Sequence, residues 1–289
     1  MTAAPGALKV YVANEGDNTI SVISTRTRTL LKTIPVGPRP RHIQASRDGS
    51  LVFFTEFGTN KLGVIDSEED TLLGEVPASR NASARPRGIW IGTSTIYVTN
   101  EVMNEISVIS GSTGAIKFAI PLAGRPSEVV VTPDEKTAYV SMPSSNKVVV
   151  LNMRTRSVSS ELTIAGGPDT LRLTPRIPAG PGTAGSRVLI VGLSGTPAQV
   201  ALVDTKSSVV RTATVNLGRR CCTHLHFRRR SALLRRPQLG RRGHVAGGGC
   251  GPRQPGRNRR RTLSLSRWRR SARNLLRRSA GRRQPEHCH

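Results

Sequence analysis

The sequence predicts an all-β fold, a β-propeller of four-stranded blades, and three observations support that class. Pairs of strand-forming residues recur with a period near 42 residues, an asparagine follows each pair at a fixed distance, and helical periodicity is absent. A four-stranded unit cannot bury both of its faces alone, whereas radial stacking of such units buries them. A β-sandwich, the alternative all-β class, does not repeat at a fixed period. The pairs are Tyr11-Val12, Phe53-Phe54, Tyr97-Val98 and Tyr139-Val140, which lie 42, 44 and 42 residues apart.

Each repeat holds short runs of strand character separated by Gly, Asn, Asp and Pro. Seven residues after the first member of each pair stands an asparagine, and a second apolar run follows it. The asparagines are Asn18, Asn60, Asn104 and Asn146, and the runs read TISVIS, KLGVID, EISVIS and KVVVLN. A proline turn then starts the strand that we expect nearest the ring axis. The prolines are Pro40, Pro86, Pro126 and Pro168, and the strands read HIQAS, GIWIG, EVVVT and TLRLT.

A fifth repeat follows at 187–192, 199–205 and 209–215, after a stretch of loop composition at 175–186. We therefore expect about five blades within residues 1–218. The first of them is expected to begin at its second strand, KVYVAN (9–14), with no inner strand before it. The acidic run 66–70 lies between two strands of one blade, and we expect it to be a solvated turn, because it lacks the spacing of a calcium loop.

Charge divides the chain after residue 218. Residues 1–218 carry a net charge of +5, whereas residues 219–289 hold 22 arginines, no lysine and a single acidic residue, Glu286. The net charge of +26 for the whole chain would by itself suggest a nucleic-acid-binding protein, but most of it comes from this tail. The total charge therefore does not describe the repeat region.

The tail has the amino-acid composition that GC-rich coding DNA gives when it is translated out of frame. When codons 219–236 are back-translated and read one base later, the permitted residues include VVAAHISISADGRLCYVA. The in-frame chain reads HIQASRDGSLVFFT at 42–55, so both share the pattern H-I-x-x-S-x-D-G-x-L-x-aromatic. We therefore expect residues 219–289 to be an out-of-frame translation and to be disordered. A shift near codons 216–220 would account for it.

The composition of the tail also suggests two alternatives. It could be a disordered arm that binds nucleic acid, because arginines neutralise phosphates and release counterions. Its cysteines and histidines could also suggest zinc, but neither CxxC nor HxxxH spacing occurs, so we expect no metal site. No cofactor is expected anywhere in the chain.

The repeat region, residues 8–218, resembles the YVTN-type β-propeller repeat family. The resemblance rests on VYVAN (10–14), IYVTN (96–100), AYVSM (138–142), and NTISVIS (18–24) followed by KTIPVGPRPRHI (32–43). Two repeats depart from the signature, with FFTE at 53–56 and LIVG at 189–192. The resemblance implies a seven-bladed parent, a binding or scaffold role, and a periplasmic or secreted location. The sequence itself shows no signal peptide and no membrane-spanning run, so the chain as written is expected in the cytoplasm.

The residues just after the proline turns are expected to crowd the mouth of the central channel, where a propeller's binding site is the default expectation. These candidates are Arg41, His42, Arg87, Ser127, Glu128, Asp169 and Thr170. The alternative is a solvated turn face with no ligand. Catalytic residues are not assigned, because a lone histidine, His42, does not make a triad.

The sequence favours a non-enzymatic binding or scaffold protein, monomeric when intact, with an unidentified ligand or protein partner at the propeller face. The alternative from resemblance is a lactonase-like propeller hydrolase, for which Arg41, His42, Arg87 and Glu128 would be candidates by position. Nucleic-acid binding through the basic tail is a second alternative. Fold alone does not separate these functions.

Overall fold

The computed structural model describes residues 1–3, 8–175, 187–195 and 199–214, and their strands form five four-stranded antiparallel sheets. The first sheet contains β1 (Thr2–Ala3), β2 (Lys9–Asn14), β3 (Thr19–Ser24) and β4 (Leu30–Pro35). The second contains β5 (Pro40–Ala45), β6 (Leu51–Glu56), β7 (Lys61–Asp66) and β8 (Thr71–Pro77). The third contains β9 (Pro86–Ile91), β10 (Thr95–Asn100), β11 (Glu105–Ser110) and β12 (Ile116–Pro121).

The last two sheets repeat this order. The fourth contains β13 (Val129–Val131), β14 (Thr137–Met142), β15 (Lys147–Asn152) and β16 (Ser157–Thr163), with a short 3₁₀ turn, η1 (Pro143–Ser145), between β14 and β15. The fifth contains β17 (Pro168–Leu173), β18 (Val188–Leu193), β19 (Gln199–Asp204) and β20 (Val210–Thr214). Within the described ranges, no helix is long and apolar enough to cross a membrane.

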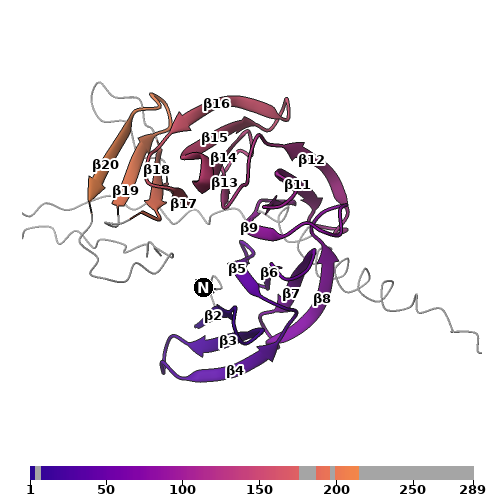
Figure 1. Cartoon of the computed structure of the whole chain (residues 1–289). Coiled ribbons are helices and arrows are strands. Elements are labelled where there is room, and N and C mark those ends of the chain that lie inside the picture. Colours follow the sequence, from indigo (N-terminus) through magenta and orange to yellow (C-terminus); the bar gives the residue numbers. More distant parts are fainter. Residues whose placement is uncertain (4–7, 176–186, 196–198, 215–289) are drawn as a thin grey trace, which may run out of the picture.

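The five sheets are the blades of a β-propeller, so the predicted fold class is confirmed. In every sheet the strands lie side by side in chain order, and the first strand is innermost. The inner strands β5, β9, β13 and β17 follow the proline turns and neighbour one another around a common centre (Figure 1). This radial arrangement brings the beginnings of the inner strands together, which is what positions the site described below.

The first blade corrects one expectation, because it does have an inner strand. Thr2 pairs with Tyr11 and Ala3 with Val10, and these two residues form β1. The backbone N–H of Ala45, in the second blade, donates to the Thr2 hydroxyl over 3.1 Å. Two residues are too short a segment to show any period in the sequence, which is why the pattern could not predict β1.

The recurring asparagine is the last residue of the turn between the second and third strands of its blade, and in three blades its backbone is left-handed. Asn18, Asn104 and Asn146 have φ of 54°, 51° and 52°. Asparagine tolerates this region better than most residues do. The carbonyl of Asn18 also accepts a hydrogen bond of 3.0 Å from the N–H of Val36, just beyond the outer strand. The carbonyls of Asn60, Asn104 and Asn146 accept the corresponding bonds from Ala78, Leu122 and Ile164.

A hydroxyl on the second strand of each central blade joins that blade to the next. The Thr99 hydroxyl accepts from the N–H of Gly88 in its own inner strand and donates to the carbonyl of Ser127 in the next blade, both over 2.7 Å. Thr55 joins His42 to Arg87 in the same way, and Ser141 joins Glu128 to Asp169. These bonds fix the backbone at the residues that the sequence predicts for the site.

The acidic run 66–70 corrects a second expectation, because most of it is buried. Asp66 is 1% exposed and Asp70 is 9% exposed, and only Glu68 and Glu69 face solvent. The hydroxyl of Tyr11 donates to Asp70 over 2.5 Å, and Lys9 Nζ lies 2.7 Å from the same carboxylate. Burial, followed by the bond to Asp70, raises the pKa of Tyr11 well above its ordinary value. The turn therefore docks the second blade against the first rather than standing in solvent.

Candidate functional site

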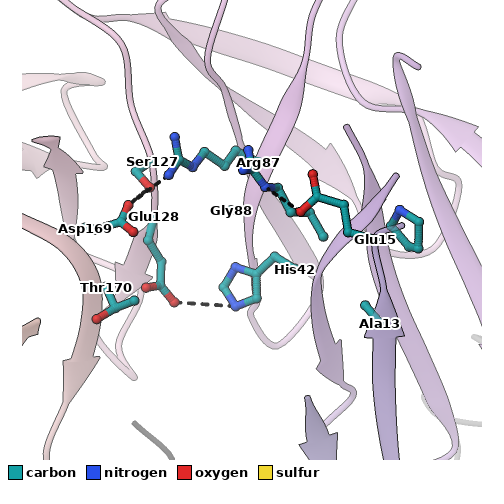
Figure 2. A pocket seen from close by; sticks show the side chains of 11 residues that line it. Ala13, Glu15, His42, Arg87, Gly88, Ser127, Glu128, Asp169 and Thr170 are labelled. Atoms are coloured by element: carbon teal, nitrogen blue, oxygen red, sulfur yellow. Dashed lines mark hydrogen bonds and ion pairs between the residues drawn. The ribbon is translucent and has the colours of Figure 1, made fainter. Parts of the chain in front are cut away.

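A pocket of about 300 Å³ opens where the inner strands begin, and all five blades contribute to it (Figure 2). All seven residues predicted from the sequence line this pocket. They are Arg41 and His42 of the second blade, Arg87 of the third, Ser127 and Glu128 of the fourth, and Asp169 and Thr170 of the fifth. The sequence reasoning missed four further lining residues, which are Ala13, Glu15, Pro40 and Gly88.

The proline turns and the hydroxyl bonds place these side chains. Each proline ends the connection from the previous blade's outer strand, and its fixed φ directs the chain into an extended inner strand. The next one or two residues then stand at the channel mouth. Thr55, Thr99 and Ser141 hold the backbone N–H groups of His42, Gly88 and Glu128, one in each of three consecutive blades.

Glu128 is the most buried acidic group of the pocket, with 6% of the residue exposed. The backbone N–H of Leu171 donates to its Oε2 over 2.7 Å. The guanidinium of Arg172 donates to Oε1, and His42 Nε2 lies 3.4 Å from the same oxygen. A buried carboxylate needs such partners, because an unpaired buried charge is strongly unfavourable.

His42 lies between Glu128 and the third blade, and both of its ring nitrogens have protein partners. The backbone N–H of Ile89 donates to Nδ1 over 3.2 Å, so Nδ1 acts as an acceptor. The proton of the neutral ring is then on Nε2, which faces the Glu128 carboxylate. This tautomer follows from the hydrogen-bond network. The ring joins two blades across the pocket, and neither nitrogen is directed at the pocket as a base.

A second polar network surrounds Asp169, which lies on the other side of Glu128 from His42 (Figure 2). Arg87 Nη2 donates to Asp169 Oδ1 over 3.0 Å, and the Ser127 hydroxyl donates to the same oxygen. Arg87 Nη1 lies 3.5 Å from Glu101 Oε2, and Arg125 Nη2 lies 3.1 Å from Glu101 Oε1. Arg87 thus connects the pocket to the surrounding face of the propeller.

Three arginines gather around one phenyl ring beside the pocket. The guanidinium carbons of Arg41, Arg39 and Arg85 lie 4.4, 4.8 and 5.7 Å from the centroid of Phe57. Each distance is within the range of a cation–π contact. Glu15 pairs with two of them, at 2.8 Å from Arg39 and 3.5 Å from Arg41. Three guanidinium groups therefore surround one phenyl ring, and a single carboxylate pairs with two of them.

Thr170 packs back against its own blade. A Cβ built on Gly192, which pairs with Thr170 in the sheet, would lie 2.2 Å from Thr170 Oγ1. Gly192 stands where Thr55, Thr99 and Ser141 stand in the central blades, so the Thr170 side chain takes the space of their hydroxyls. In the part of the chain that the structure describes, no three His, Cys, Asp or Glu side chains are close enough together to hold a metal ion.

Comparison with known proteins supports the fold. No family model matches the chain. Hydrazine synthase from Kuenenia stuttgartiensis matches with a TM-score of 0.54 and 18% identity, over 71% of this chain and 65% of the other. The dihydro-heme d1 dehydrogenase NirN, in complex with DHE, matches with a TM-score of 0.59 and 15% identity, over 73% and 45%. Both are β-propeller proteins, and at these identities the likeness shows the fold alone.

A curated relative matches in sequence. The chain is 26% identical over 140 residues to Antigen Lp49 from Leptospira interrogans serogroup Icterohaemorrhagiae serovar copenhageni (strain Fiocruz L1-130). The match covers 45% of this chain and 30% of the relative, so it spans less than a third of that protein.

Proposed function

We propose that this protein is a non-enzymatic binding module of the YVTN repeat type, whose ligand is a small anion held at the channel mouth. One observation carries the proposal. Side chains from all five blades converge on a single pocket of about 300 Å³, and those side chains include Arg41 and Arg87. Their side chains are 32% and 27% exposed, so a ligand can reach both guanidinium groups.

The charge around the pocket supports an anionic ligand. Five arginines, which we call the arginine rim, stand on this face, and Glu15 and Glu101 each pair with two of them. The rim consists of Arg39, Arg41, Arg85, Arg87 and Arg125. Glu128 and Asp169 also belong to this face, and Arg172 pairs with Glu128, so six arginines stand against four carboxylates. This excess of positive groups favours a ligand with carboxylate or phosphate oxygens, which arginine binds through directed, charge-assisted hydrogen bonds.

The geometry of His42 supports binding over hydrolysis. A general base must present a nitrogen to the reacting group or its water. His42 is the only histidine in the described ranges, and its nitrogens contact Ile89 and Glu128. The lactonase-like alternative would have to displace one of these contacts first. A lactone-hydrolysis assay on the purified chain separates the two functions.

The domain boundary belongs to the same proposal. Residues 1–218 form the propeller part, and residues 219–289, which lie outside the described ranges, are an out-of-frame tail. The resemblance to YVTN propellers supports a seven-bladed monomer and a periplasmic or secreted location for the parent protein.

Calorimetric titration of the full chain tests the proposed function with inorganic phosphate, succinate and citrate as probes. The tail holds 22 arginines and will attract anions too, so the pocket is isolated by comparing variants. We expect at least one probe to bind wild type more tightly than Arg41→Ala or Arg87→Ala. Arg47→Ala, at the exposed turn between β5 and β6, is the matched control and should bind as wild type does. Equal binding by all four proteins would overturn the proposal.

A further inference from the structure

The fifth blade has one apolar face that no other described blade covers. Leu189, Val191 and Leu193 of β18 are buried against the fourth blade. Ile190, between them, is only half-buried, and Leu202, its partner on β19, is 40% exposed. The residues on either side of Leu202, Ala201 and Val203, are fully buried.

In the central blades the equivalent face is covered by the next blade. Ile190 occupies the position of Tyr97 and Tyr139, which are buried toward the fourth and fifth blades. Ile190 pairs with the fourth residue after Pro168, as Tyr97 pairs with the fourth residue after Pro86, so the strand register corrects the equivalent stretch of the fifth repeat from 189–192 to 190–193. Leu202 occupies the position of Val108, which is buried in the core between the third and fourth blades. The face of Ile190 and Leu202 is therefore of the kind that a following blade buries.

The shifted reading of codons 219–236 matches the second blade at the positions that the fold requires. Its shared Ser, Asp and Gly correspond to Ser46, Asp48 and Gly49. The Ser46 hydroxyl donates to Asp48 over 2.6 Å, and Gly49 has a φ of 74°. Its shared Ile and Leu correspond to Ile43 and Leu51, which are 2% exposed. The shifted codons thus permit, in one register, the residues that the second blade uses in its turn and in its core.

The spacing along the chain agrees with this correspondence. The pocket residues His42, Glu128 and Thr170 each follow the end of an outer strand by seven residues, and Gly88 follows by eleven. The histidine of the shifted reading stands at codon 223, nine codons after β20 ends at Thr214. Its aromatic position, at codon 234, lies 44 codons after Ile190, which equals the spacing from Phe53 to Tyr97.

We propose that the codons from 219 onward, read one base later, encode a sixth blade, which packs on the face formed by Ile190 and Leu202. Codons 219–236 supply its first two strands, and the shifted histidine stands in its inner strand in the position equivalent to His42. The sixth blade thereby adds a histidine to the channel mouth. This proposal stands on burial and codon register, and it does not depend on the ligand of the pocket.

Cysteine labelling tests the proposal in the full chain. Leu202→Cys is introduced into the chain as written and into the same chain with one base removed near codon 217. Val209→Cys, which lies in the outer turn between β19 and β20 and is 49% exposed, is the control. Maleimide labelling is followed on the peptide that carries each cysteine, because the tail has cysteines of its own. We expect the shift to slow labelling at position 202 at least tenfold and to leave position 209 unchanged.

Equal labelling of position 202 in the two chains would overturn the proposal. The proposal would also be overturned if position 202 of the chain as written became more protected from labelling at higher protein concentration, because a second copy would then cover the face. Sequencing the genomic DNA across codons 210–225 gives a readout that does not require either protein to fold. A genomic sequence that keeps the present frame would also overturn the proposal.

Discussion

The ring of Phe54 fills the space that any side chain at position 63 would need. Phe54 and Gly63 pair across β6 and β7, and a Cβ built on Gly63 would lie 1.9 Å from Phe54 Cζ. The equivalent cross-strand pairs in the first and third blades are Val12–Ser21 and Val98–Ser107. The larger residue on one strand is thus matched by the loss of a side chain on the other. Phe54 and Gly63 of the second blade are therefore one compensated change relative to the first and third blades.

This compensation predicts that Gly63→Ser alone destabilises the protein. An added side chain in a packed interior costs about 1–3 kcal/mol, whereas Phe54→Val removes the obstructing ring. Phe54→Val alone leaves a cavity and is also destabilising. The double variant recreates the pair of the third blade, and it should lose less free energy of unfolding than the two single variants lose together. Denaturant midpoints of the four proteins measure the coupling, and additive effects would contradict the proposed fit.

The hydroxyl between blades gives a second prediction. Thr99→Val keeps the side-chain shape but leaves the N–H of Gly88 and the carbonyl of Ser127 without this partner. Leaving buried polar groups unsatisfied costs about 1–3 kcal/mol. Thr99→Ser retains the hydroxyl and serves as the control. We expect the urea midpoint to fall clearly for valine and much less for serine. A loss for serine as large as the loss for valine would contradict this prediction, because the methyl group of Thr99 would then contribute as much as its hydroxyl.

Binding at the channel mouth should depend on both pocket arginines. For the probe anion that binds most tightly, Arg41→Ala and Arg87→Ala should each weaken binding by about 1.5–3 kcal/mol, the range for a lost hydrogen bond to a charged group. Arg41→Ala leaves Glu15 paired with Arg39, whereas Arg87→Ala removes the ion pair of Asp169, so the loss should be larger for Arg87→Ala. Titration calorimetry measures both affinities. An arginine whose removal leaves the affinity unchanged lies outside the site.

The sequence was sufficient to predict the blades and the channel mouth because both follow from local signals that repeat. The period of the pairs of strand-forming residues predicted the four-stranded sheets, and the proline turns predicted the positions of the seven pocket residues. Contacts between blades were harder to foresee. Tyr11 buries Asp70 from 59 positions away, so the acidic run 66–70 could only look like a solvated turn. The hydroxyl of Thr99 bonds a carbonyl in the next blade, and nothing adjacent in the sequence marks that contact.

Glu15 shows the same limit at the site itself. It stands in an ordinary hairpin loop of the first blade, yet it pairs with Arg39 and Arg41 of the second. A period identifies which positions are equivalent, but it does not say which side chain of one blade reaches the next. The networks of the pocket therefore had to come from the structure.

Glu56 gives the protein a predicted dependence of stability on pH. It is fully buried at the end of β6, and its Oε1 accepts from the N–H of Gly37 over 3.2 Å. Burial, together with the nearby negative charge of Glu75, raises the pKa of Glu56 from its ordinary value of 4.5 to about 7. Lys61 lies beside this pair and holds Glu75 at 2.5 Å.

Between pH 4.5 and 7 the folded protein keeps a proton on Glu56 that the unfolded chain has lost, because its pKa is raised only in the folded state. Protons then favour the folded state, so this contribution to stability is complete below about pH 4.5 and disappears as the pH rises through about 7. Glu56→Gln carries no titrating proton there, so its melting temperature relative to wild type should be higher at pH 8 than at pH 5. Glu75→Gln, which removes the neighbouring charge and keeps Glu56, should flatten the dependence only in part. Parallel melting-temperature profiles for wild type and Glu56→Gln from pH 5 to 8 would show that Glu56 does not titrate in this range.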